Sequence, residues 1–386
     1  MTDVVFTFSV EMFEDAVNRE FCRPPDQTLL ALARDERVGR LLVADSWRSY
    51  LASAARRRPI RLTEPLTVAG RDAVRVRPHR VRTVEATELA TVERSYRAYG
   101  ALLGRALARA RGERRPRPES AALVTYHPFV AAFCDAPWIG PIVYFGQDDW
   151  ATGEGVRPWW DLYREAYQRI DERKAAIFAV SDELAARISP RVTVVPNGVD
   201  PDVWRPRHPA PARIAALPGP RAIYTGTVDD RLERRLVEAT AAAVGSVIMM
   251  GHPGDPDTIR WLRSLDNVHV FGSVGQAELA ATVRACDVGL IPHRDQAGIR
   301  AMSPLKLYEY LAAGLPVVSV DTPPVHGVDD DRVVIVPRDD WAAGLAMAIA
   351  LGRATEERRL RFLEEVSWQR RMRPVVDAAT VSPLRN

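Results

Sequence analysis

Short runs of apolar residues alternate with helical patterns along the first half of the chain. Most of these runs are nearly continuous in apolar residues, which is typical of parallel strands buried on both faces. The predicted strands are residues 4–8, 40–44, 121–126, 141–145, 176–180 and 192–195. The predicted helices are residues 27–37, 88–111, 159–173 and 182–188. Such alternation predicts a parallel sheet covered on both faces, while residues 59–82 are expected to form short strands and loops.

The same alternation starts again in the second half. Here the predicted strands are residues 222–225, 246–250, 267–271, 287–291, 316–320 and 333–336. The predicted helices are residues 231–244, 256–264, 277–285, 303–314, 341–351 and 356–368. Between the halves, prolines crowd residues 201–220, which show no clear period and predict a linker. We therefore expect an α/β protein of two doubly wound domains, 1–200 and 221–370, facing across a cleft, with residues 371–386 as a tail returning to the first domain.

Length and composition agree with this organisation. A chain of 386 residues exceeds the roughly 250–300 at which one core stops growing. The hydrophobic share of 47% and the charged share of 27% are typical of a globular protein. No apolar run approaches the ~20 residues that cross a bilayer, and the N-terminal start lacks a basic region, so we expect a cytoplasmic protein. Cys22, Cys134 and Cys286 show no metal spacing and are expected to be reduced core residues.

The charge of the chain is informative mainly through its choice of cations. A net charge of +3 is too small to favour nucleic acid as a partner. Lys174 and Lys306 are the only lysines among 53 lysines and arginines. Against this bias, a lysine at position 306 indicates a need for a compact ammonium, because Lys acts on phosphate as a point charge.

Lys306 lies in a predicted helix with clear start and stop signals. Ser303 is expected to be its N-cap, and Pro304 to occupy the first helical position, where a missing N–H costs nothing. Gly314 is expected to end the helix in the left-handed conformation. A strand follows at once.

The start of this helix suggests a phosphate site. The free N–H groups of Leu305 and Lys306 and the positive end of the helix dipole would attract an anion bound next to Ser303. Glu309 lies about one turn further on the same face, where a carboxylate can accept both hydroxyls of a ribose. The alternative interpretation is an ordinary capped helix with an exposed Lys–Glu pair.

Glycines follow three strands of the second half, at Gly226, Gly251 and Gly272. Because the carboxyl ends of parallel strands share one edge of a sheet, these turns are expected to lie on the rim where the Ser303 helix also opens. The sequence contains no Gly-x-x-x-x-Gly-Lys-Ser/Thr loop, no complete Gly-x-Gly-x-x-Gly after the first strand, no Gly-x-Ser-x-Gly elbow and no His-Glu-x-x-His.

Two strand ends of the first half carry further candidates. His127 follows one predicted strand, and Asp148 and Asp149 follow another, so His127 with either aspartate is a candidate to act on a bound substrate. The alternative is a capping aspartate and a hydrogen-bonded loop histidine. Nearby tryptophans are either core residues or a stacking wall for a ring-shaped acceptor; they are Trp138, Trp150, Trp159 and Trp160.

The stretch from Arg94 to Arg117 holds eight arginines and one acid, with apolar residues at helical spacing. A basic amphipathic helix of this kind can lie on an anionic membrane surface. The alternative is a solvated arginine face with an apolar stripe in the core. We expect a peripheral contact of this helix with the inner face of the membrane.

Several motifs together resemble a known family. The runs from Asn267 to Val274, from Asp287 to Pro292 and from Ser303 to Val318 resemble the donor domain of the GT-B-fold retaining glycosyltransferases of the family-four, or "group 1", type. The run from Val195 to Asp200 is similar to the interdomain turn of that family. The stretch around Asp148 and the Ser-Pro-x-Lys form resemble a bacterial branch that acts on cell-surface polysaccharides and related glycans.

The resemblance implies two Rossmann-like domains, with the acceptor on the first and a UDP- or GDP-sugar on the second. It further implies transfer of a hexose with retention of configuration and without a metal or other cofactor, in which the departing phosphate helps to deprotonate the acceptor hydroxyl. The implied donor-site residues are Gly226, Thr227, Arg231, His252, Val270, Phe271, Gly272, Ser273, Arg294, Ser303, Pro304, Leu305, Lys306 and Glu309. The implied catalytic candidates are His127, Asp148, Arg300 and Lys306.

The resemblance also fixes individual roles. Glu309 is expected to bind the ribose, Lys306 and the Leu305 amide to bind the diphosphate, and the backbone of residues 270–273 to bind the base. Gly226 allows close approach of the chain to the phosphates.

The chain departs from the family pattern at two places. Many members pair two glutamates eight positions apart, whereas Ala301 stands eight residues before Glu309, so that Arg300 or Arg294 becomes a candidate phosphate contact. The usual Arg and Lys after the first strand of the second domain are also missing, and Arg231 is the candidate substitute. A GT-B-fold sugar-nucleotide epimerase and a non-catalytic nucleotide-sugar-binding partner protein therefore stay open as alternatives.

Overall fold

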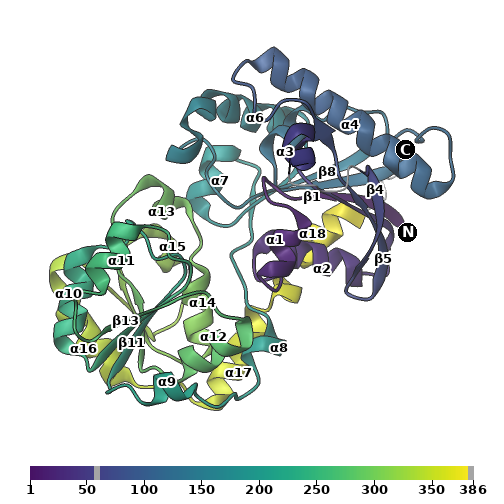
Figure 1. Ribbon diagram of the computed structural model, residues 1–386. Helices are drawn as coiled ribbons and strands as arrows, with labels where there is room; N and C mark the ends of the chain where they lie inside the picture. Colours follow the sequence, from purple (N-terminus) through teal and green to yellow (C-terminus); the bar gives the residue numbers. More distant parts are fainter. Residues whose placement is uncertain (56–60, 381–386) are drawn as a thin grey trace. The chain divides into compact units, whose positions relative to one another are not determined.

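The structure is a computed structural model that describes residues 1–55 and 61–380 (Figure 1). The chain divides into two compact units. The first comprises Met1–Pro196 together with the C-terminal segment from Met372, and the second comprises Asn197–Arg371. Each unit is built around a sheet of its own.

Within the described residues, the first unit has an eight-stranded sheet of order β10-β9-β8-β7-β1-β2-β5-β4. Its strands are β1 (Thr2–Thr7), β2 (Val38–Ala44), β4 (Thr63–Val68), β5 (Arg71–Val76), β7 (Ala121–Thr125), β8 (Ile139–Gly146), β9 (Ala176–Ala179) and β10 (Thr193–Val194). All neighbours pair in parallel except β4 and β5, which form an antiparallel hairpin. The turn residues of that hairpin, Ala69 and Gly70, both have positive φ, as a tight hairpin turn requires.

The helices of the first unit are α1 (Phe13–Asn18), α2 (Pro24–Arg34), α3 (Tyr50–Ala55), α4 (Leu89–Arg111), α5 (Pro128–Phe133), α6 (Trp160–Glu172), α7 (Asp182–Ile188) and the end of α18 (Trp368–Thr380). A separate parallel pair is formed by β3 (Arg48–Ser49) and β6 (His79–Arg80). The predicted strand–helix alternation of this half is confirmed. Of the segment predicted as short strands and loops, residues 59 and 60 lie outside the described residues, and β4, β5 and β6 account for most of the rest.

The second unit has a fully parallel sheet, described here as six strands in the order β13-β12-β11-β14-β15-β16. The strands are β11 (Arg221–Thr225), β12 (Ser246–Met250), β13 (Val268–Phe271), β14 (Val288–Ile291), β15 (Val317–Val320) and β16 (Val333–Val336). The helices are α8 (Pro201–Trp204), α9 (Ala212–Ala215), α10 (Arg234–Ala243), α11 (Pro256–Leu262), α12 (Gln276–Arg284), α13 (Ala297–Ala301), α14 (Leu305–Ala312), α15 (Pro323–His326), α16 (Trp341–Leu351) and α17 (Glu356–Glu365). Each strand predicted in this half is present.

Alternate residues of these strands pack into two separate hydrophobic cores. On β11, Ile223 packs with residues of α12, α14 and α17, whereas Tyr224 packs with residues of α10, α11 and α16. Figure 1 shows α10 and α16 on one side of this sheet and α12, α14 and α17 on the other. Since side chains of a strand alternate between faces, the continuous apolar runs of the sequence follow from burial on both faces.

The order of the second sheet reverses between β11 and β14. The chain moves outward from β11 through β12 to β13, then returns to position β14 on the other side of β11. In open α/β sheets such a reversal opens a crevice at the carboxyl ends of the two strands. Gly226 follows β11 and His293 lies just beyond β14, so both residues lie at this switch point.

The proline-rich stretch 201–220 is not the linker that the sequence suggested. It contains α8 and α9, and Trp204 and Ile214 from these helices are buried in the core beside α12 and α17. The units instead divide between Pro196 and Asn197 and again within α18. Of the C-terminal tail, residues 372–380 belong to the first unit, and residues 381–386 lie outside the described part of the chain.

Candidate donor site at the strand ends of the second unit

Helix α14 starts one residue later than predicted. Pro304 is the N-cap residue in extended conformation and Leu305 is the first helical residue. Ser303 is not the N-cap, which corrects the sequence-based expectation. Its Oγ accepts a hydrogen bond from the Asn197 backbone N–H at 3.2 Å, and its carbonyl accepts one from Asn197 Nδ2 at 2.6 Å. The serine is therefore used to fix the Asn197 turn instead of the helix start.

The other end of α14 agrees with the prediction. Gly314 has φ +83°, and its N–H donates to the Leu311 carbonyl at 3.0 Å. The Leu315 N–H donates to the Tyr310 carbonyl at 2.9 Å. These bonds satisfy the last carbonyls of the helix, as a left-handed C-terminal glycine allows.

Lys306 is buried at the switch point, with 9% of its surface exposed. Its Nζ lies 3.9 Å from the centroid of the Tyr224 ring and 3.2 Å from Nε2 of His293. Burial lowers the pKa of the amine well below its usual value, and the charge of Arg231 lowers it further. The exposed Lys–Glu pair of the alternative interpretation is therefore excluded.

His293 is a candidate site residue that the sequence pattern did not single out. It is buried, and its Nε2 lies 3.4 Å from the Tyr224 hydroxyl as well as beside Lys306. Burial and the neighbouring Lys306 hold the pKa of the imidazole well below its usual range. The ring is thus a neutral acceptor for a lysine ammonium. Gly226 was selected because it follows a parallel strand. His293 follows the neighbouring strand, so the same criterion could have selected it.

Glu309 is half-buried on the same helix. Its Oε2 lies 3.5 Å from Thr225 Oγ1, at the end of β11. Burial raises the pKa of the carboxyl to about 7, against the opposing effects of the Lys306 charge and the Thr225 hydrogen bond. Beneath it, the Tyr310 hydroxyl accepts a hydrogen bond from the Thr225 N–H at 2.8 Å, which ties α14 to β11.

The glycines after β11 and β12 allow an unusually close backbone approach. Gly226 and Gly251 have φ of +115° and +148°. A Cβ at Gly251 would lie 2.0 Å from the Gly226 carbonyl oxygen, so a larger residue is excluded there. A Cβ at Gly226 would lie 3.5 Å from Lys306 Nζ. The predicted placement of these glycines at strand ends on one rim is confirmed.

Arg231 lies on the loop that crosses this rim. Its Nε contacts both carboxylate oxygens of Asp229, at 2.9 and 3.0 Å, and its carbonyl accepts a hydrogen bond from the Arg294 N–H at 2.9 Å. The next residue, Leu232, pairs with His293 as an isolated antiparallel bridge. The loop is thus held against the segment that follows β14, and its arginine is near enough to affect Lys306.

The remaining donor-site candidates are spread along the same edge. The carbonyl of Thr227 accepts a hydrogen bond from the Tyr224 hydroxyl, and that of His252 accepts one from the Val228 N–H. Val270 and Phe271 are half-buried at the end of β13, and Gly272 and Ser273 after them are exposed.

Arg300 and Ala301 close α13. The Arg300 guanidinium pairs with the exposed Asp295 through bonds of 2.7 and 3.1 Å. Ala301 is buried, so the position of the missing glutamate contributes to packing. Arg294 is half-buried just before this helix.

In the first unit, His127 is the N-cap residue of α5. Its Nδ1 accepts a hydrogen bond from the Phe129 N–H at 3.2 Å, and its Nε2 lies 3.1 Å from the Tyr96 hydroxyl. Tyr96 in turn donates to Glu85 at 3.0 Å. Burial lowers the pKa of His127 to about 4, so the ring is neutral. Both ring nitrogens are engaged, which favours the loop-histidine alternative.

The two aspartates after β8 differ in environment. Asp149 is buried and pairs with Arg187, and it also accepts hydrogen bonds from Thr152 Oγ1 at 2.8 Å and the Ala151 N–H at 3.0 Å. Asp148 is exposed and lies 3.2 Å from Gln147 Nε2. Asp149 thus has a structural environment, and Asp148 is the aspartate that meets solvent.

The tryptophans do not form one wall. Trp138 is a core residue whose Nε1 donates to the Gly100 carbonyl at 2.8 Å. Trp159 and Trp160 are partly buried and donate to backbone carbonyls. Trp150 stacks on His127 with ring centroids 6.4 Å apart.

Comparison with known proteins gives a family match within the second unit. Residues 219–351 match the family model "Glycosyl transferases group 1". This part of the second unit is therefore similar to the group 1 glycosyl transferases. Every donor-site candidate from Gly226 to Glu309 falls inside the matched range, whereas His127 and Asp148 fall outside it.

A curated relative is the putative teichuronic acid biosynthesis glycosyltransferase TuaH of Bacillus subtilis (strain 168), which is 27% identical over 42% of this chain. The match spans less than half, 44%, of the relative's own length.

Solved structures match the whole chain in fold. The apo structure of OtsA has a TM-score of 0.65 at 13% identity, covering 99% of this chain and 100% of that one. An E. coli trehalose-6-phosphate protein bound with UDP-2-fluoro glucose has a TM-score of 0.64 at 13% identity, covering 98% and 100%. A sucrose-phosphate synthase from Thermosynechococcus elongatus has a TM-score of 0.62 at 13% identity, covering 97% of both chains. The predicted GT-B fold is confirmed.

Two further features of the structure concern metal ions and membranes. Among residues 1–55 and 61–380, no group of three or more His, Cys, Asp or Glu side chains is arranged to hold a metal ion. Within the same residues no helix is long and apolar enough to cross a membrane. The cysteines of the described residues form no disulfide; Cys134 and Cys286 are buried, as expected, and Cys22 is partly exposed.

Proposed function

We propose that this chain is a retaining glycosyltransferase that moves a hexose from a nucleoside diphosphate sugar to a hydroxyl acceptor. The observation that carries the proposal is the burial of Lys306 between His293, Tyr224 and Gly226 at the switch point of a unit similar to the group 1 glycosyl transferases. An isolated buried lysine is costly unless a partner compensates for its charge. A diphosphate is such a partner.

The donor phosphates would lie at the N-terminus of α14. There the N–H groups of the first helical turn have no partner inside the helix, and the helix dipole favours an anion. Lys306 adds a full charge, and Arg231 lies near enough to add a second. Glu309, half-buried further along the helix, would accept the ribose hydroxyls.

The base would meet the edge of β13. We assign residues 270–273 to it through backbone groups, with Arg294 and Arg300 as candidate phosphate contacts. UDP is the first nucleotide to test, because one protein of the same fold is described as bound with UDP-2-fluoro glucose. A glycan is the first acceptor class to test, because a relative is described as a teichuronic acid biosynthesis enzyme.

The transfer itself needs charge stabilisation and positioning. The bond between the anomeric carbon and the diphosphate oxygen breaks, and the acceptor oxygen bonds to the same face of that carbon. The acceptor proton passes to the departing phosphate. Lys306, Arg231 and the helix N–H groups would stabilise the negative charge that builds on the diphosphate. Asp148, as the exposed aspartate of its pair, is the better first-unit candidate for an acceptor contact than the fully bonded His127.

The proposal is tested by ligand-dependent stability followed by turnover. A thermal-shift panel of UDP, GDP and ADP should single out one nucleotide, and the matching nucleotide glucose should be hydrolysed slowly to glucose and the nucleoside diphosphate. Nuclear magnetic resonance of the released sugar gives its anomeric configuration, and the α anomer is expected from an α-linked donor. Binding without turnover over a broad acceptor panel would favour the binding protein, and an epimerised donor would favour the epimerase.

A contact of α4 with a membrane is a separate, electrostatic proposal. The apolar stripe of α4 is buried in the first unit, through residues such as Tyr99, Leu103 and Leu107, so it is not available for insertion. The exposed arginines of α4 form the remaining basic face, and they are Arg94, Arg97, Arg105 and Arg109. We infer weak binding to anionic lipid that salt suppresses. Flotation with phosphatidylglycerol vesicles at low salt tests it, and recovery only in the unbound fraction would end it.

A further inference from the structure

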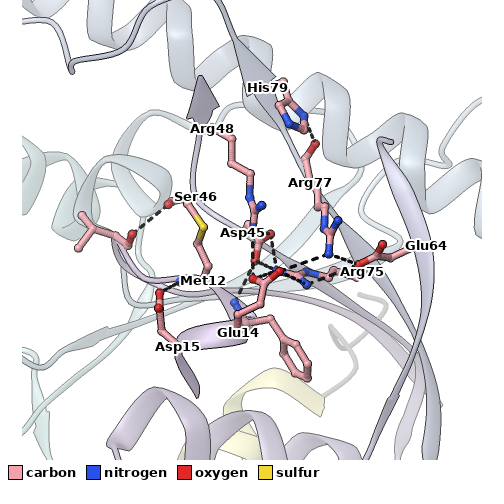
Figure 2. A network of polar contacts seen from close by, with 12 residues as sticks. Met12, Glu14, Asp15, Asp45, Ser46, Arg48, Glu64, Arg75, Arg77 and His79 are labelled. Atoms are coloured by element: carbon pink, nitrogen blue, oxygen red, sulfur yellow. Dashed lines mark hydrogen bonds and ion pairs between the residues drawn. The ribbon is translucent and has the colours of Figure 1, made fainter. Parts of the chain in front are cut away.

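A network of buried arginines and carboxylates lies at the carboxyl edge of the first sheet (Figure 2). Asp45 follows β2 and Arg75 lies at the end of the neighbouring β5. Arg48 comes from β3, Arg77 follows β5, and Glu14 comes from α1. The carboxyl ends of parallel strands are where open α/β sheets bind ligands, and the donor site of the second unit does not use this network.

The arginines are fixed from below by Asp45. This carboxylate is fully buried and accepts bonds from Arg75 NH2 at 2.9 and 3.1 Å and contacts Arg48 NH2 at 2.7 Å. It also accepts a bond from the Phe13 N–H at 3.1 Å. With only 4% of their side chains exposed, Arg48 and Arg75 are rigid parts of the unit.

Two carboxylates meet the network from the solvent side: Glu64, 29% exposed, pairs with Arg77 at 2.6 Å and Arg75 at 3.5 Å, and Glu14 is the more exposed of the two. Glu14 contacts Arg75 NH1 at 2.8 Å, Arg48 NH2 at 3.1 Å and Arg77 NH2 at 3.3 Å, and it also pairs with Arg75 NH2. Figure 2 shows these side chains converging on Glu14. Yet 47% of the Glu14 side chain is exposed, and it sits on a helix of only six residues. Glu14 is therefore the displaceable member of the network.

The network also contains hydrogen-bonding atoms that nothing in the described chain satisfies. They are Nε of Arg48, Arg75 and Arg77 and Nε2 of His79. Arg48, Arg75 and His79 are each more than nine-tenths buried. Since His79 Nδ1 lies 2.9 Å from the Arg77 carbonyl, its Nε2 is the free acceptor of a neutral ring. Buried polar atoms are almost always paired, so the unpaired Nε–H donors of the arginines indicate a missing acceptor, whereas Nε2 of His79 would need a hydroxyl donor of the same ligand.

We propose that Arg48, Arg75 and Arg77 form a binding site for an anionic group of the acceptor, a carboxylate or a phosphate, which Glu14 occupies until the acceptor arrives. The identification of the ligand as the acceptor rests on the proposed transferase activity. The existence of an anion site rests on the contacts of the network alone. Guanidinium forks bind both kinds of oxyanion through paired N–H groups. Asp45, Glu14 and Glu64 balance the three arginines, so exchanging Glu14 for a ligand monoanion leaves the charge of the site unchanged.

The charge state of Glu14 is consistent with such an exchange. Burial alone would raise the pKa of Glu14. The hydrogen bond from Arg75 and the charges of Arg75 and Arg48 outweigh this effect and lower the pKa to about 2. Glu14 is therefore an anion at neutral pH and a direct competitor of an anionic ligand.

The variant that tests the exchange is Glu14→Gln. It removes the competing charge and leaves the arginines in place, so glucose 6-phosphate or glucuronate should raise the melting temperature of Glu14→Gln far more than that of the native chain. Their Kd, measured by calorimetry, should fall by about tenfold or more. Glucose, which carries no charge, should have no effect on either protein. A larger effect of glucose 6-phosphate assigns a phosphate, and a larger effect of glucuronate assigns a carboxylate.

Two further variants make the result specific. Glu14→Gln combined with Arg77→Gln should lose the response to the anions, because one of the three arginines is removed. Glu165→Gln, which removes a carboxylate from a surface pair with Arg169 on α6, should behave as the native chain. If Glu14→Gln does not fold, Glu14→Asp provides the same measurement with a carboxylate that reaches less far. An anion response in Glu14→Gln no greater than in the native chain overturns the proposal and leaves the network a structural one.

The failure of this inference is distinguishable from failure of the proposed function. UDP binding at Lys306 is measured on the same proteins and should not change in Glu14→Gln. Anion binding without any nucleotide binding would support the anion site and contradict the transferase. Nucleotide binding and turnover without an anion response would support the transferase activity and contradict the anion site.

Discussion

Nε2 of His293 lies 3.2 Å from Nζ of Lys306, so two basic groups share one buried position. They are not both cations, because like charges at this distance repel strongly away from water. The arrangement makes His293 the acceptor that orients the ammonium toward the rim, with the Tyr224 ring covering its other side. In the proposed donor site, His293 would therefore be a positioning residue.

Replacing His293 by phenylalanine should weaken UDP binding by about tenfold, since a hydrogen bond to a charged group contributes about 1.5–3 kcal/mol. Phenylalanine keeps most of the ring volume, so the fold should persist. Calorimetric titration with UDP measures the change. His326→Phe is the matched control, because His326 is exposed and pairs with Asp321 away from Lys306. An unchanged Kd in His293→Phe would remove His293 from the site.

Nucleotide binding should take up a proton. The pKa of Lys306 is well below its usual value because of burial and the charge of Arg231, and an incoming diphosphate favours the ammonium. The affinity for UDP should therefore fall as the pH rises above the lowered pKa of the free site. Titrations at a pH of about 8.5, where Glu309 is ionised, in buffers of different ionisation enthalpy count the protons.

The control for this coupling is Lys306→Arg, whose guanidinium stays protonated and should bind without proton uptake. A binding enthalpy that does not depend on the buffer in the native chain would contradict the coupling.

Glu309→Gln should stabilise the free protein while weakening the nucleotide complex. Burial raises the pKa of this carboxyl from 4.5 to about 7, so the folded state holds the proton more tightly than the unfolded chain. Ionisation therefore costs stability as the pH rises from 4.5 to about 7, and the full cost persists above that range. The free energy of unfolding should rise by about 1–3 kcal/mol at alkaline pH and by little in acid.

Chemical denaturation at both pH values measures the stability, and UDP titration measures the loss of the ribose contact. A variant that is less stable than the native chain in alkali would contradict the assigned cost, and unchanged UDP binding would refute the assigned role.

The two rim glycines should respond differently to alanine. At Gly251 the new Cβ would lie 2.0 Å from a backbone oxygen at φ +148°, so Gly251→Ala should lower the free energy of unfolding by several kcal/mol. At Gly226 the φ of +115° also strains an alanine, but the nearest atoms, at 3.5 Å, belong to the flexible Lys306 side chain. Gly226→Ala should therefore lose less stability than Gly251→Ala and should lose UDP affinity.

Gly155→Ala is the control for this pair, because Gly155 lies in the first unit and no atom lies within 4 Å of its Cβ. Thermal melts compare the stability of the three variants, and UDP titrations compare their affinity for the nucleotide. Equal loss of stability in Gly226→Ala and Gly251→Ala would mean that Gly226 serves the backbone alone.

The sequence predicted the sheets and the glycines at the ends of their strands because both depend on local pattern. Buried parallel strands are recognisable as continuous apolar runs, and glycines at strand ends mark the edge that binds ligands. These signals selected the candidate site residues between Gly226 and Glu309. His293 follows the same rule but has no distinctive local context, and only the distance to Lys306 reveals it.

Other features depended on contacts between distant segments. Ser303 has the residue type of an N-cap, yet Asn197, more than a hundred residues away, takes its Oγ. The stretch 201–220 reads as a linker from its prolines, and only the burial of Trp204 and Ile214 ties it to the second unit. The arginine network of the first unit joins five short segments, none of which carries a motif.

The central claim is that Lys306 holds the diphosphate of a nucleotide sugar, and one titration tests it directly. UDP binding is measured by calorimetry for the native chain, Lys306→Met and Lys174→Met. Lys174, the other lysine of the chain, is exposed in the first unit and is the matched control. We predict that Lys306→Met loses affinity by about a hundredfold and that Lys174→Met binds as the native chain does. Equal affinity in all three proteins would contradict the account.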